Sequence, residues 1–446
     1  MRIKEEFAQR IIEAAIKAGA DKAEVYIVRA RSVSVEVKDG EVDSLDTSSD
    51  FGYALRVLKD ERPGFSYSTT GDDWQTVVDS ALDVARFTER DPSIDIAEPQ
   101  EDEDIQTHDP EIASADETRI VECARMIEEE AYRTDPRVKK IRKAEAGFSE
   151  SEVLISNTKG LTKGYKATSV IGQIMLAAEQ ADEAQMGWGY ESSRFLKNID
   201  FRRVGQDAAM RAVRLLGARR ASTTKGFVLV EASVAAELLG ILSSSFSSEN
   251  VQKGKSMLMN KKDEQVFSEL VCIVDNPLLS EYVGSRPFDA EGVTSRRNIV
   301  VDRGVLKGYL YNIYTARREN LHSTGNAIRG GIQSPPSVGI SNFYIEPASP
   351  ESVRSYAELV KGIDKGMIVT EAMGMHTANP ITGEFSVGVT GLWVKNGKID
   401  HPVKEAAISG NLIDLFNKVV AFSDNTRFYG RVGSPDILIE GINISG

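Results

Sequence analysis

Between residues 23 and 69, apolar and polar side chains alternate with a period of two. In the stretch AEVYIVRARSVSVEVKDGEVDSL, the alternating apolar side chains are Val25, Ile27, Val33, Val35 and Val37. The dipeptide Asp39-Gly40 predicts a hairpin turn after them, and FGYALRVLKDERPGFSYS repeats the pattern with a second turn predicted near Pro63-Gly64. Because successive strand residues point to opposite faces, this stretch predicts an antiparallel meander with one buried face.

Helices are predicted on both sides of this meander. Residues 4–18 carry apolar side chains at helical spacing and are followed by Gly19, a stop signal. A second helix is predicted over 74–88, with Asp73 as its cap. The next predicted elements are a helix over 116–132, strands near 138–156 and 162–180, and a helix over 202–217.

The rest of the chain is richer in glycine and in hairpin turns, such as VDRGVLKGYLY and WVKNGKIDHPV. Strands are predicted near 226–230, 267–274, 297–302, 306–312, 366–371, 386–395 and 434–444. Helices are predicted near 232–245, 351–362 and 410–418. The pattern indicates an α+β fold whose C-terminal part is a β-rich mixed domain with packed helices.

Two domains are expected, an N-terminal α/β domain over 1–200 and a second domain over 201–446. Their boundary is placed between about 180 and 225, where glycine and predicted hairpin turns become more frequent. Within the first domain, residues 91–115 are acidic and poor in large apolar side chains, which is typical of a surface linker.

Composition excludes several classes of protein. A net charge of −13 argues against a nucleic-acid binder, and the densest basic run, RVKKIRK at 137–143, is interpreted as a solvated strand face. Only Cys123 and Cys272 occur, so no disulfide framework or cysteine-rich zinc site is predicted. No apolar stretch approaches the roughly 18 residues of a membrane span. We therefore expect a soluble, cytoplasmic protein with neither nucleic acid nor membrane as partner.

Familiar catalytic motifs are missing. The chain contains no G-x-G-x-x-G, no phosphate-binding P-loop and no G-x-S-x-G. Its four histidines are His108, His322, His376 and His401, and none has a second histidine within helical reach. H-E-x-x-H metal chemistry is therefore excluded.

Three loops rich in polar residues are the candidate functional segments, at 285–297, 322–331 and 374–386. Loops that join regular elements often carry binding residues. The candidate residues in these loops are Arg286, Asp289, Glu291, Arg329, His376 and Glu384. The alternative is that internal salt bridges and backbone contacts simply hold these loops in shape.

A set of ordered sequence blocks within about 225–446 resembles one family. The blocks are SRPFDAEGV, VDRGVLKGYLYNIYTARREN, STGNA, ITGEFSVGVTGLWVKNGKI, and ISGNLIDLF with FSDNTRF. They resemble the TldD/PmbA family of bacterial and archaeal proteases, once labelled modulators of DNA gyrase. The resemblance implies two branches that associate as a heterodimer. The TldD branch carries an H-E-x-x-x-H helix and a distant cysteine that together hold a catalytic metal.

In this chain the window that corresponds to H-E-x-x-x-H falls on Leu239 to Ser244. The histidine positions are Leu239 and Ser244, and the glutamate position is Gly240. The cysteine-bearing loop also has no counterpart, because FYGRVGSPDILIEG runs almost directly into the last predicted strand. Leucine cannot ligate a metal and glycine offers no base, so the resemblance is to the PmbA branch, also called TldE.

The resemblance implies a subunit with no cofactor or catalytic residue of its own, whose TldD-type partner carries zinc. In the family, such complexes act on unfolded peptides, trim the leader of a peptide-antibiotic precursor and degrade an antitoxin. The six candidate loop residues would then line a substrate chamber or the interface with the partner.

Three alternatives stay open. The first is a hydrolase with an unrecognised site, built from Ser244 to Ser248, Glu371, His376 and Glu384. A second alternative is a homodimeric module that binds peptides or proteins. The third is a regulator that binds a topoisomerase, although nothing in the residues specifies one.

Overall fold

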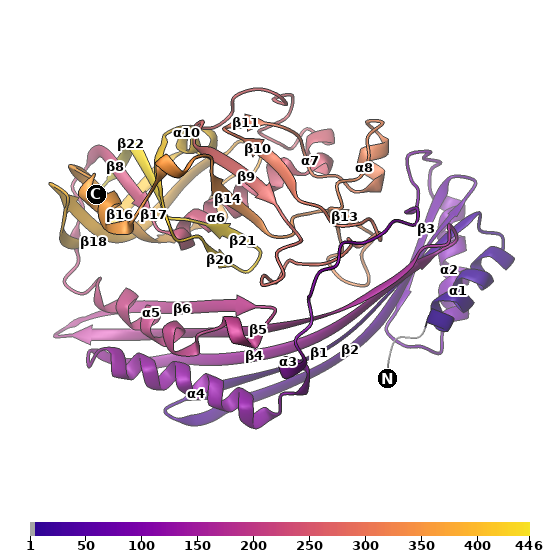
Figure 1. Cartoon of the computed structure of the whole chain (residues 1–446), viewed down its shortest axis with the longest axis horizontal. Helices are drawn as coiled ribbons and strands as arrows, with labels where there is room; N and C mark the ends of the chain where they lie inside the picture. The colour runs from indigo at the N-terminus through magenta and orange to yellow at the C-terminus, as the bar shows by residue number, and fades with distance from the viewer. Residues whose placement is uncertain (1–4) are drawn as a thin grey trace.

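The computed structural model describes residues 5–446. One six-stranded antiparallel sheet dominates its N-terminal half, in the order β3-β2-β1-β4-β5-β6. These strands are β1 Lys22–Lys38, β2 Glu41–Lys59, β3 Arg62–Ser68, β4 Val138–Asn157, β5 Thr162–Gln180 and β6 Glu183–Ser193. The predicted meander is confirmed as β1, β2 and β3. Figure 1 shows that the long strands curve beneath the C-terminal half of the molecule.

All the large helices of this half cover one face of the sheet. They are α1 Glu5–Lys17, α2 Trp74–Phe87, α4 Glu117–Thr134 and α5 Phe201–Val213. On β1, Val25 and Ile27 pack with α1 and α2, while Val33 and Val35 pack with α4 and α5. These side chains share one parity along the strand, so both helix pairs lie on the same face. The opposite parity, exemplified by Tyr26, contacts the C-terminal half.

The hairpin turn at Asp39-Gly40 is confirmed, and both residues have positive φ angles of 54° and 78°. The second predicted hairpin is also present, but its turn lies three residues earlier than predicted. The chain reverses at Asp60-Glu61, with φ angles of 53° and 59°, and Pro63 lies inside β3. Because β3 is an edge strand, a proline without an N–H is tolerated there.

The glycine of that pair serves helix packing instead of a turn. A Cβ on Gly64 would lie 1.9 Å from the carbonyl oxygen of Ala81 on α2. The predicted cap of this helix is also wrong in its chemistry. Asp73 occupies the cap position, but its carboxylate accepts hydrogen bonds from Tyr53 Oη (2.9 Å) and Ser68 Oγ (2.7 Å) instead of from the helix.

The acidic segment after α2 is a packed strap instead of a solvated linker. It crosses from the end of the sheet near β3 to the short helix α3, Pro110–Ser114 (Figure 1). Within the strap, the side chains of Ile96 and Ala97 are buried, and Asp95 binds Lys22 (2.7 Å) and Lys159 (3.0 Å). A few buried apolar side chains therefore hold the strap in place, although its overall composition is acidic.

The C-terminal half, residues 218–446, contains two larger sheets around one core. The eight-stranded sheet has the order β15-β19-β22-β8-β16-β17-β18-β7, and a six-stranded sheet has the order β11-β10-β9-β14-β21-β20. The first comprises β7 Arg219–Arg220, β8 Thr224–Val230, β15 Val353–Arg354, β16 Lys365–Met373, β17 Glu384–Lys395, β18 Lys398–Asn411, β19 Val419–Ser423 and β22 Ile437–Ser445. The second comprises β9 Val271–Asp275, β10 Asn298–Asp302, β11 Val305–Leu306, β14 Phe343–Pro347, β20 Arg427–Tyr429 and β21 Val432–Ser434.

Short elements complete this half. They are α6 Ala232–Ser243, α7 Ser248–Gln252, α8 Ile313–Arg317, α9 Tyr356–Lys361, α10 Leu412–Asn417 and the ribbon of β12 Ala327–Ile328 with β13 Ser337–Val338. The predicted strand over 306–312 is wrong beyond β11. Tyr309 enters the core and donates its hydroxyl to the carbonyl oxygen of Leu258 (2.6 Å), and Asn312 then starts α8 with a capping box.

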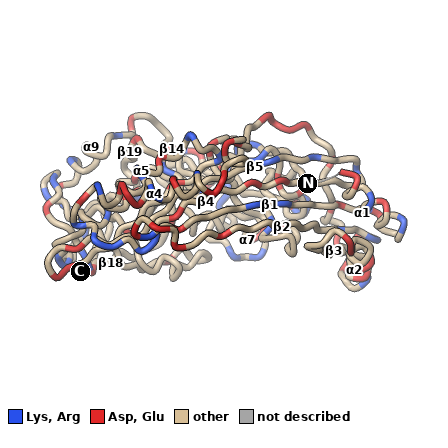
Figure 2. Tube along the Cα trace, turned by 90° about the horizontal axis from the view of Figure 1, so that it is seen from below, with Lys and Arg blue, Asp and Glu red and all other residues tan. Residues whose placement is uncertain are grey.

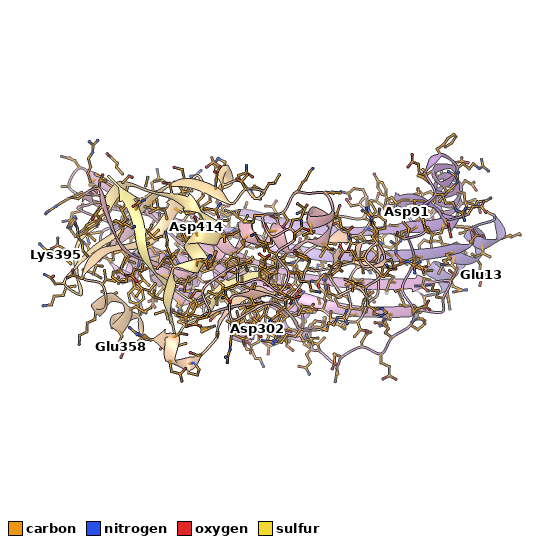
Figure 3. All side chains as sticks on the ribbon, turned by 90° about the horizontal axis from the view of Figure 1, so that it is seen from above. Glu13, Asp91, Asp302, Glu358, Lys395 and Asp414 are labelled. Atoms are coloured by element: carbon orange, nitrogen blue, oxygen red, sulfur yellow. The ribbon has the colours of Figure 1, made fainter. Side chains whose placement is uncertain are left out.

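The α+β fold class is confirmed. Figure 3 shows an elongated molecule with Glu13 of α1 near one end and Lys395 near the other. The basic run 137–143 lies in β4, where Val138 and Ile141 are buried while Lys139, Lys140 and Arg142 are exposed. Basic and acidic residues are interspersed along this side of the molecule (Figure 2). Among residues 5–446, no helix is both long enough and apolar enough to cross a membrane.

Candidate functional site

Helix α6 lies where the C-terminal half meets the concave side of the N-terminal sheet (Figure 1). Its N-terminus is fixed by Glu231, whose carboxylate receives two hydrogen bonds from Arg214 (2.7 and 2.6 Å) and one from Tyr356 Oη (3.1 Å). One side of the helix packs into the C-terminal core through Val234, Ala235, Leu238, Leu239 and Leu242. The other side carries Ser233 and Glu237, one turn apart, toward the N-terminal sheet.

A cavity of about 570 Å³ separates this side of α6 from β5 and β6. We call it the α6 cavity and define it by Trp188, Tyr190, Glu237 and Tyr429. Tyr429 packs edge-on against Trp188, with ring centroids 5.8 Å apart, and stacks on Tyr190 at 6.4 Å. The guanidinium of Arg211 lies 3.9 Å from the centre of the Trp188 ring and donates to Tyr429 Oη (3.2 Å). The result is a fixed aromatic wall.

The alternation of small and aromatic residues in β6 builds this wall. Gly187 and Gly189 face α5, where an added Cβ would lie 2.1 Å from the carbonyl oxygen of Ala208 and 2.0 Å from that of Val204. The helix can therefore pack directly on the strand. Because neighbouring strand residues point to opposite faces, Trp188 is directed into the cavity.

One carboxyl group, that of Glu237, borders the α6 cavity, and that of Glu371 is close enough to interact with it electrostatically. Burial, followed by repulsion from Glu371, raises the pKa of Glu237. Burial also raises the pKa of Glu371, although Arg211 and Arg214 act in the opposite direction. The Oε1 atom of Glu371 is buried and has no hydrogen-bond partner. A carboxyl group with a raised pKa is more readily protonated and can donate a hydrogen bond, for example to a peptide carbonyl.

Two of the predicted residues, Glu291 and Arg329, take part in ion pairs at the junction with the N-terminal sheet. Arg56 of β2 binds Glu291 (2.9 Å) and Glu24 of β1 (2.9 Å), and Arg329 binds the second oxygen of Glu24 (3.2 Å). Both carboxylates are fully buried, and Arg329 also lies over the ring of Tyr26 at 4.7 Å. This buried chain of charges fastens loops 285–297 and 322–331 to the sheet.

Asp289 organises its own loop. Its carboxylate accepts hydrogen bonds from the backbone N–H groups of Glu291 (2.9 Å), Val293 (3.0 Å) and Ala327 (2.9 Å). Burial, followed by repulsion from Glu291, raises the pKa of Asp289 to about 7. Asp289 thus holds loop 285–297 in shape through backbone contacts, which agrees with the alternative interpretation of the polar loops.

His376 and Glu384 lie elsewhere. Both are exposed, His376 in the connection between β16 and β17 and Glu384 at the start of β17, and neither borders the α6 cavity or contacts the Arg56 ion pairs. Sequence reasoning brought them together with Arg286 only because all of them lie in loops rich in polar residues.

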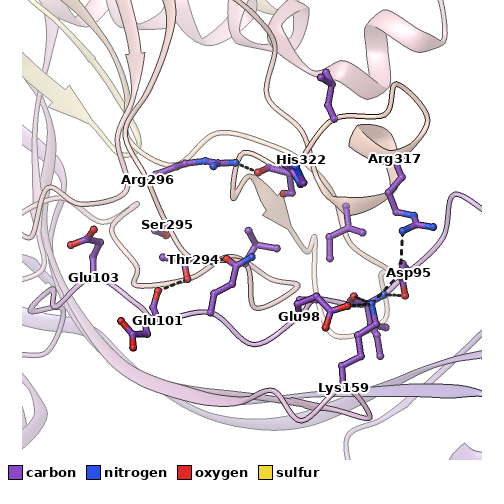
Figure 4. Close-up of a pocket in the computed structure, with 17 residues that line it drawn as sticks. Asp95, Glu98, Glu101, Glu103, Lys159, Thr294, Ser295, Arg296, Arg317 and His322 are labelled. Atoms are coloured by element: carbon purple, nitrogen blue, oxygen red, sulfur yellow. Dashed lines mark hydrogen bonds and ion pairs between the residues drawn. The ribbon is translucent and has the colours of Figure 1, made fainter.

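A further pocket of about 520 Å³ lies beneath the strap (Figure 4). Its floor is held by Lys159, which binds Asp95 (3.0 Å) and Glu98 (2.8 Å), and by Arg317, which binds Asp95 (3.2 Å). Thr294 donates to the carbonyl oxygen of Glu101 (2.9 Å) on the opposite side. The charged groups of this floor are paired with one another, so this part of the pocket serves to anchor the strap.

Models of the PmbA/TldA metallopeptidase domain 1, central domain and C-terminal domain match residues 23–85, 110–216 and 223–446, respectively. The chain belongs to the PmbA/TldA metallopeptidase family. The α6 cavity lies between the central and C-terminal domains of this PmbA/TldA protein, and the Arg56 ion pairs connect its first and C-terminal domains.

Its relatives within the family match over nearly their whole length. The metalloprotease PmbA of Escherichia coli O157:H7 is 29% identical over 96% of this chain and 93% of that protein. A Thermotoga maritima protein described as a modulator of a DNA gyrase has a TM-score of 0.91 and 29% identity, and covers 99% of this chain and 100% of its own. TldE from Thermococcus kodakarensis, at 22% identity and a TM-score of 0.89, over 99% of this chain and 100% of its own, shares the fold.

A catalytic metal of the family does not fit the residues of α6. Leu239 is fully buried in the core, as expected for a packing residue, and Gly240 has no side chain. Ser244 ends the helix and donates its hydroxyl to the carbonyl oxygen of Ile241 (3.0 Å). Within residues 5–446, no group of three or more His, Cys, Asp or Glu side chains is arranged to hold a metal ion.

The alternative hydrolase site is not assembled either. Ser245 donates to the carbonyl oxygen of Pro380 (3.3 Å), and Ser248 donates to Thr315 Oγ1 (2.8 Å). In the part of the chain that the structure describes, no hydrogen bond joins any of these serines to His376. A nucleophile needs a base within hydrogen-bond reach, and no serine of this segment has one.

Proposed function

We propose that this PmbA/TldA protein is the metal-free, TldE-type subunit of a TldD/TldE metalloprotease complex that acts on unfolded peptides. One observation carries the proposal. The α6 cavity, a preformed aromatic cavity of about 570 Å³, borders a helix whose metal-ligand positions are Leu239, Gly240 and Ser244. The chain thus has a space suited to a peptide without the groups that would cleave one.

The α6 cavity suits binding that does not depend on sequence. Trp188, Tyr190 and Tyr429 offer flat apolar surfaces to any side chain, and Glu237 supplies a hydrogen-bonding group beside them. The edge strand β6 carries Trp188 and Tyr190, and an extended peptide can pair with a strand edge through backbone hydrogen bonds alone. An unfolded chain meets these requirements better than a folded protein does.

The partner in this proposal is a TldD-type subunit that carries zinc on its own H-E-x-x-x-H helix. Zinc held by that motif would supply the Lewis-acid chemistry for hydrolysis of a peptide bond. The present chain would enclose and position the peptide, in the cytoplasm. A homodimer without a TldD-type partner is the competing assembly, and it would make the chain a peptide-binding module.

A mixing experiment tests the proposal. This chain, a TldD-type subunit and an equimolar mixture are each incubated with a fluorescently labelled unfolded peptide, with and without a chelator. We expect this chain alone to be inert, the mixture to elute as a heterodimer and cleave, and chelator to stop the cleavage. Chelator-resistant cleavage by the chain alone would contradict the proposal. A homodimer that persists in the mixture and does not bind the TldD-type subunit would also contradict it.

A further inference from the structure

A second, smaller cavity of about 130 Å³ lies between the N-terminal sheet and the loops of the C-terminal half. Four arginines from distant parts of the sequence line it: Arg194, Arg286, Arg329 and Arg431. Arg329 is paired with Glu24, so we call the space the arginine cavity and define it by Arg194, Arg286 and Arg431. Arg194 follows β6, Arg286 belongs to loop 285–297, and Arg431 lies between β20 and β21. Tyr26 and Tyr165 complete the side formed by the sheet.

Within the described residues 5–446, none of these three guanidinium groups forms an ion pair with a carboxylate. Arg194 donates only to backbone carbonyl oxygens, those of Thr168 (3.0 Å), Val283 (2.6 Å) and Ser285 (3.0 Å), and its Nε atom is buried without a partner. Arg286 donates to the carbonyl oxygen of Gly325 (3.3 Å), and its Nε atom is likewise buried and unpartnered. Across residues 5–446, the guanidinium of Arg431 forms no hydrogen bond or ion pair.

One acid, Asp289, also lines the arginine cavity, but it and the neighbouring acids accept hydrogen bonds from groups other than the three arginines. Asp289 accepts three backbone hydrogen bonds, and Asp275 accepts hydrogen bonds from Asn326 (2.7 Å) and from the backbone (2.6 Å) and hydroxyl (2.9 Å) of Ser341. Glu24 is bound by Arg56 and Arg329. The positive charge of the arginine cavity is therefore not neutralised by direct ion pairs.

The three guanidinium groups repel one another. Burial, together with repulsion from Arg431 and Arg286, lowers the pKa of Arg194 to about 10, so the group is still charged at neutral pH. Partial desolvation, followed by repulsion from Arg286, also lowers the pKa of Arg431, whose side chain still reaches the solvent. Buried charges are costly unless they are paired, and an anion placed among the three would supply the missing partner.

We propose that the arginine cavity binds a small oxyanion, either a carboxylate group or inorganic phosphate. Guanidinium groups match the spacing of carboxylate and phosphate oxygens and bind them through paired hydrogen bonds. A volume of about 130 Å³ corresponds to roughly four water molecules at about 30 Å³ each, which accommodates such a group but no nucleotide. Arg431 is exposed to solvent, which provides a route of entry.

Two sources could supply this chemistry. One is a free oxyanion, whose binding does not depend on the proposed peptidase role. The other is the C-terminal carboxylate of a peptide, which would anchor one end of that peptide in the arginine cavity. This second source rests on the proposed peptidase role. A free C-terminus and an amidated one differ only in this group, so they separate the two sources.

The test uses the full chain and titrations with inorganic phosphate, with acetate, and with one unfolded peptide whose C-terminus is either free or amidated. Isothermal calorimetry is performed at constant ionic strength with chloride as the balancing salt. The variants are Arg286→Gln and Arg431→Gln, with Arg431→Lys to retain the charge. Arg10→Gln, at an exposed arginine of α1, is the matched control for removal of one positive charge.

We expect saturable binding of at least one oxyanion, a dissociation constant raised about tenfold or more by R286Q and R431Q, and no change in R10Q. Tighter binding of the free than of the amidated peptide would identify a peptide terminus, and binding of phosphate alone would identify a free ion. Two results would overturn the proposal: no saturable binding to the wild-type chain, or binding that both cavity variants leave unchanged. An anomalous signal from selenate soaked into wild-type crystals gives a second readout that needs no variant, and its absence from the cavity at saturation would count equally against the proposal.

Discussion

Arg56 and Glu291 are 235 residues apart in the sequence, yet their side chains form a buried ion pair of 2.9 Å. Arg56 belongs to β2 of the N-terminal sheet, and Glu291 belongs to a loop of the C-terminal half. Glu24 completes the contact on the other side of the guanidinium. This pair fixes the position of one half of the molecule on the other. It therefore also fixes the shape of the α6 cavity and the arginine cavity, which lie between the two halves.

Replacing Arg56 with leucine should destabilise the protein. Glu291 would lose its ion pair while fully buried, and removal of one partner from a buried pair costs about 3–5 kcal/mol. Arg90→Leu is the matched control, because Arg90 pairs with Glu61 at the surface, where such a pair contributes about 0–1 kcal/mol. The free energy of unfolding in urea measures both, and equal losses in the two variants would contradict the assigned role of Arg56.

The stability of the protein should depend on pH through Asp289. Its pKa is raised from the ordinary value of 3.8 to about 7, so the folded state binds the proton more tightly than the unfolded state does. The contribution of Asp289 to stability is thus fully present below pH 3.8 and is lost as the pH rises toward 7. Asp289→Asn removes this titration. Unfolding free energies measured between pH 5 and pH 8 should fall less steeply in the variant, and identical slopes would show that Asp289 does not titrate there.

Gly187→Ala should disturb the packing of α5 on β6. The new Cβ would lie 2.1 Å from the carbonyl oxygen of Ala208, so helix and strand must separate, and overpacking of this kind costs about 1–3 kcal/mol. Gly71→Ala is the control, because no atom lies within 4 Å of its added Cβ. Thermal unfolding compares the two, and a wild-type melting temperature for G187A would refute the packing argument.

Trp188→Ala should weaken peptide binding in the α6 cavity. The substitution removes the central ring of the aromatic wall and the surface on which Arg211 rests. We expect the dissociation constant of a labelled unfolded peptide to rise about tenfold, which corresponds to about 1.4 kcal/mol. Tyr67→Ala, at a half-exposed aromatic residue of β3, serves as control. Fluorescence anisotropy measures both constants, and unchanged binding in W188A would place the peptide elsewhere.

Sequence patterns predicted the parts of this fold that depend on local periodicity. The alternation of Val25, Ile27 and Val33 located the β1–β2 hairpin, and the apolar spacing of residues 232–245 located α6 and the packing position of Leu239. Pro63-Gly64 was misinterpreted as a turn because a glycine required by the close approach of a helix looks the same in sequence as one required by a turn.

The remainder of the site depends on contacts between distant segments. Arg194, Arg286 and Arg431 have no common motif, and only the curvature of the sheet beneath the C-terminal half brings them together. Sequence reasoning found Arg286 but missed Arg194, Arg431 and the aromatic wall. One signal was available for the wall, since GWGY in β6 alternates the smallest residue with aromatic ones on opposite faces of a strand.

The zinc content of the purified heterodimer tests the central claim most directly. The chain is mixed with a TldD-type subunit, the complex is isolated, and zinc per complex is measured by mass spectrometry. Both motif histidines of the partner are then replaced by alanine and the measurement is repeated. We predict one zinc ion in the first complex and none in the second, because Leu239, Gly240 and Ser244 offer no ligand set. Zinc retained in the second complex, or a second zinc ion in the first, would show that this chain holds a metal and would contradict the account.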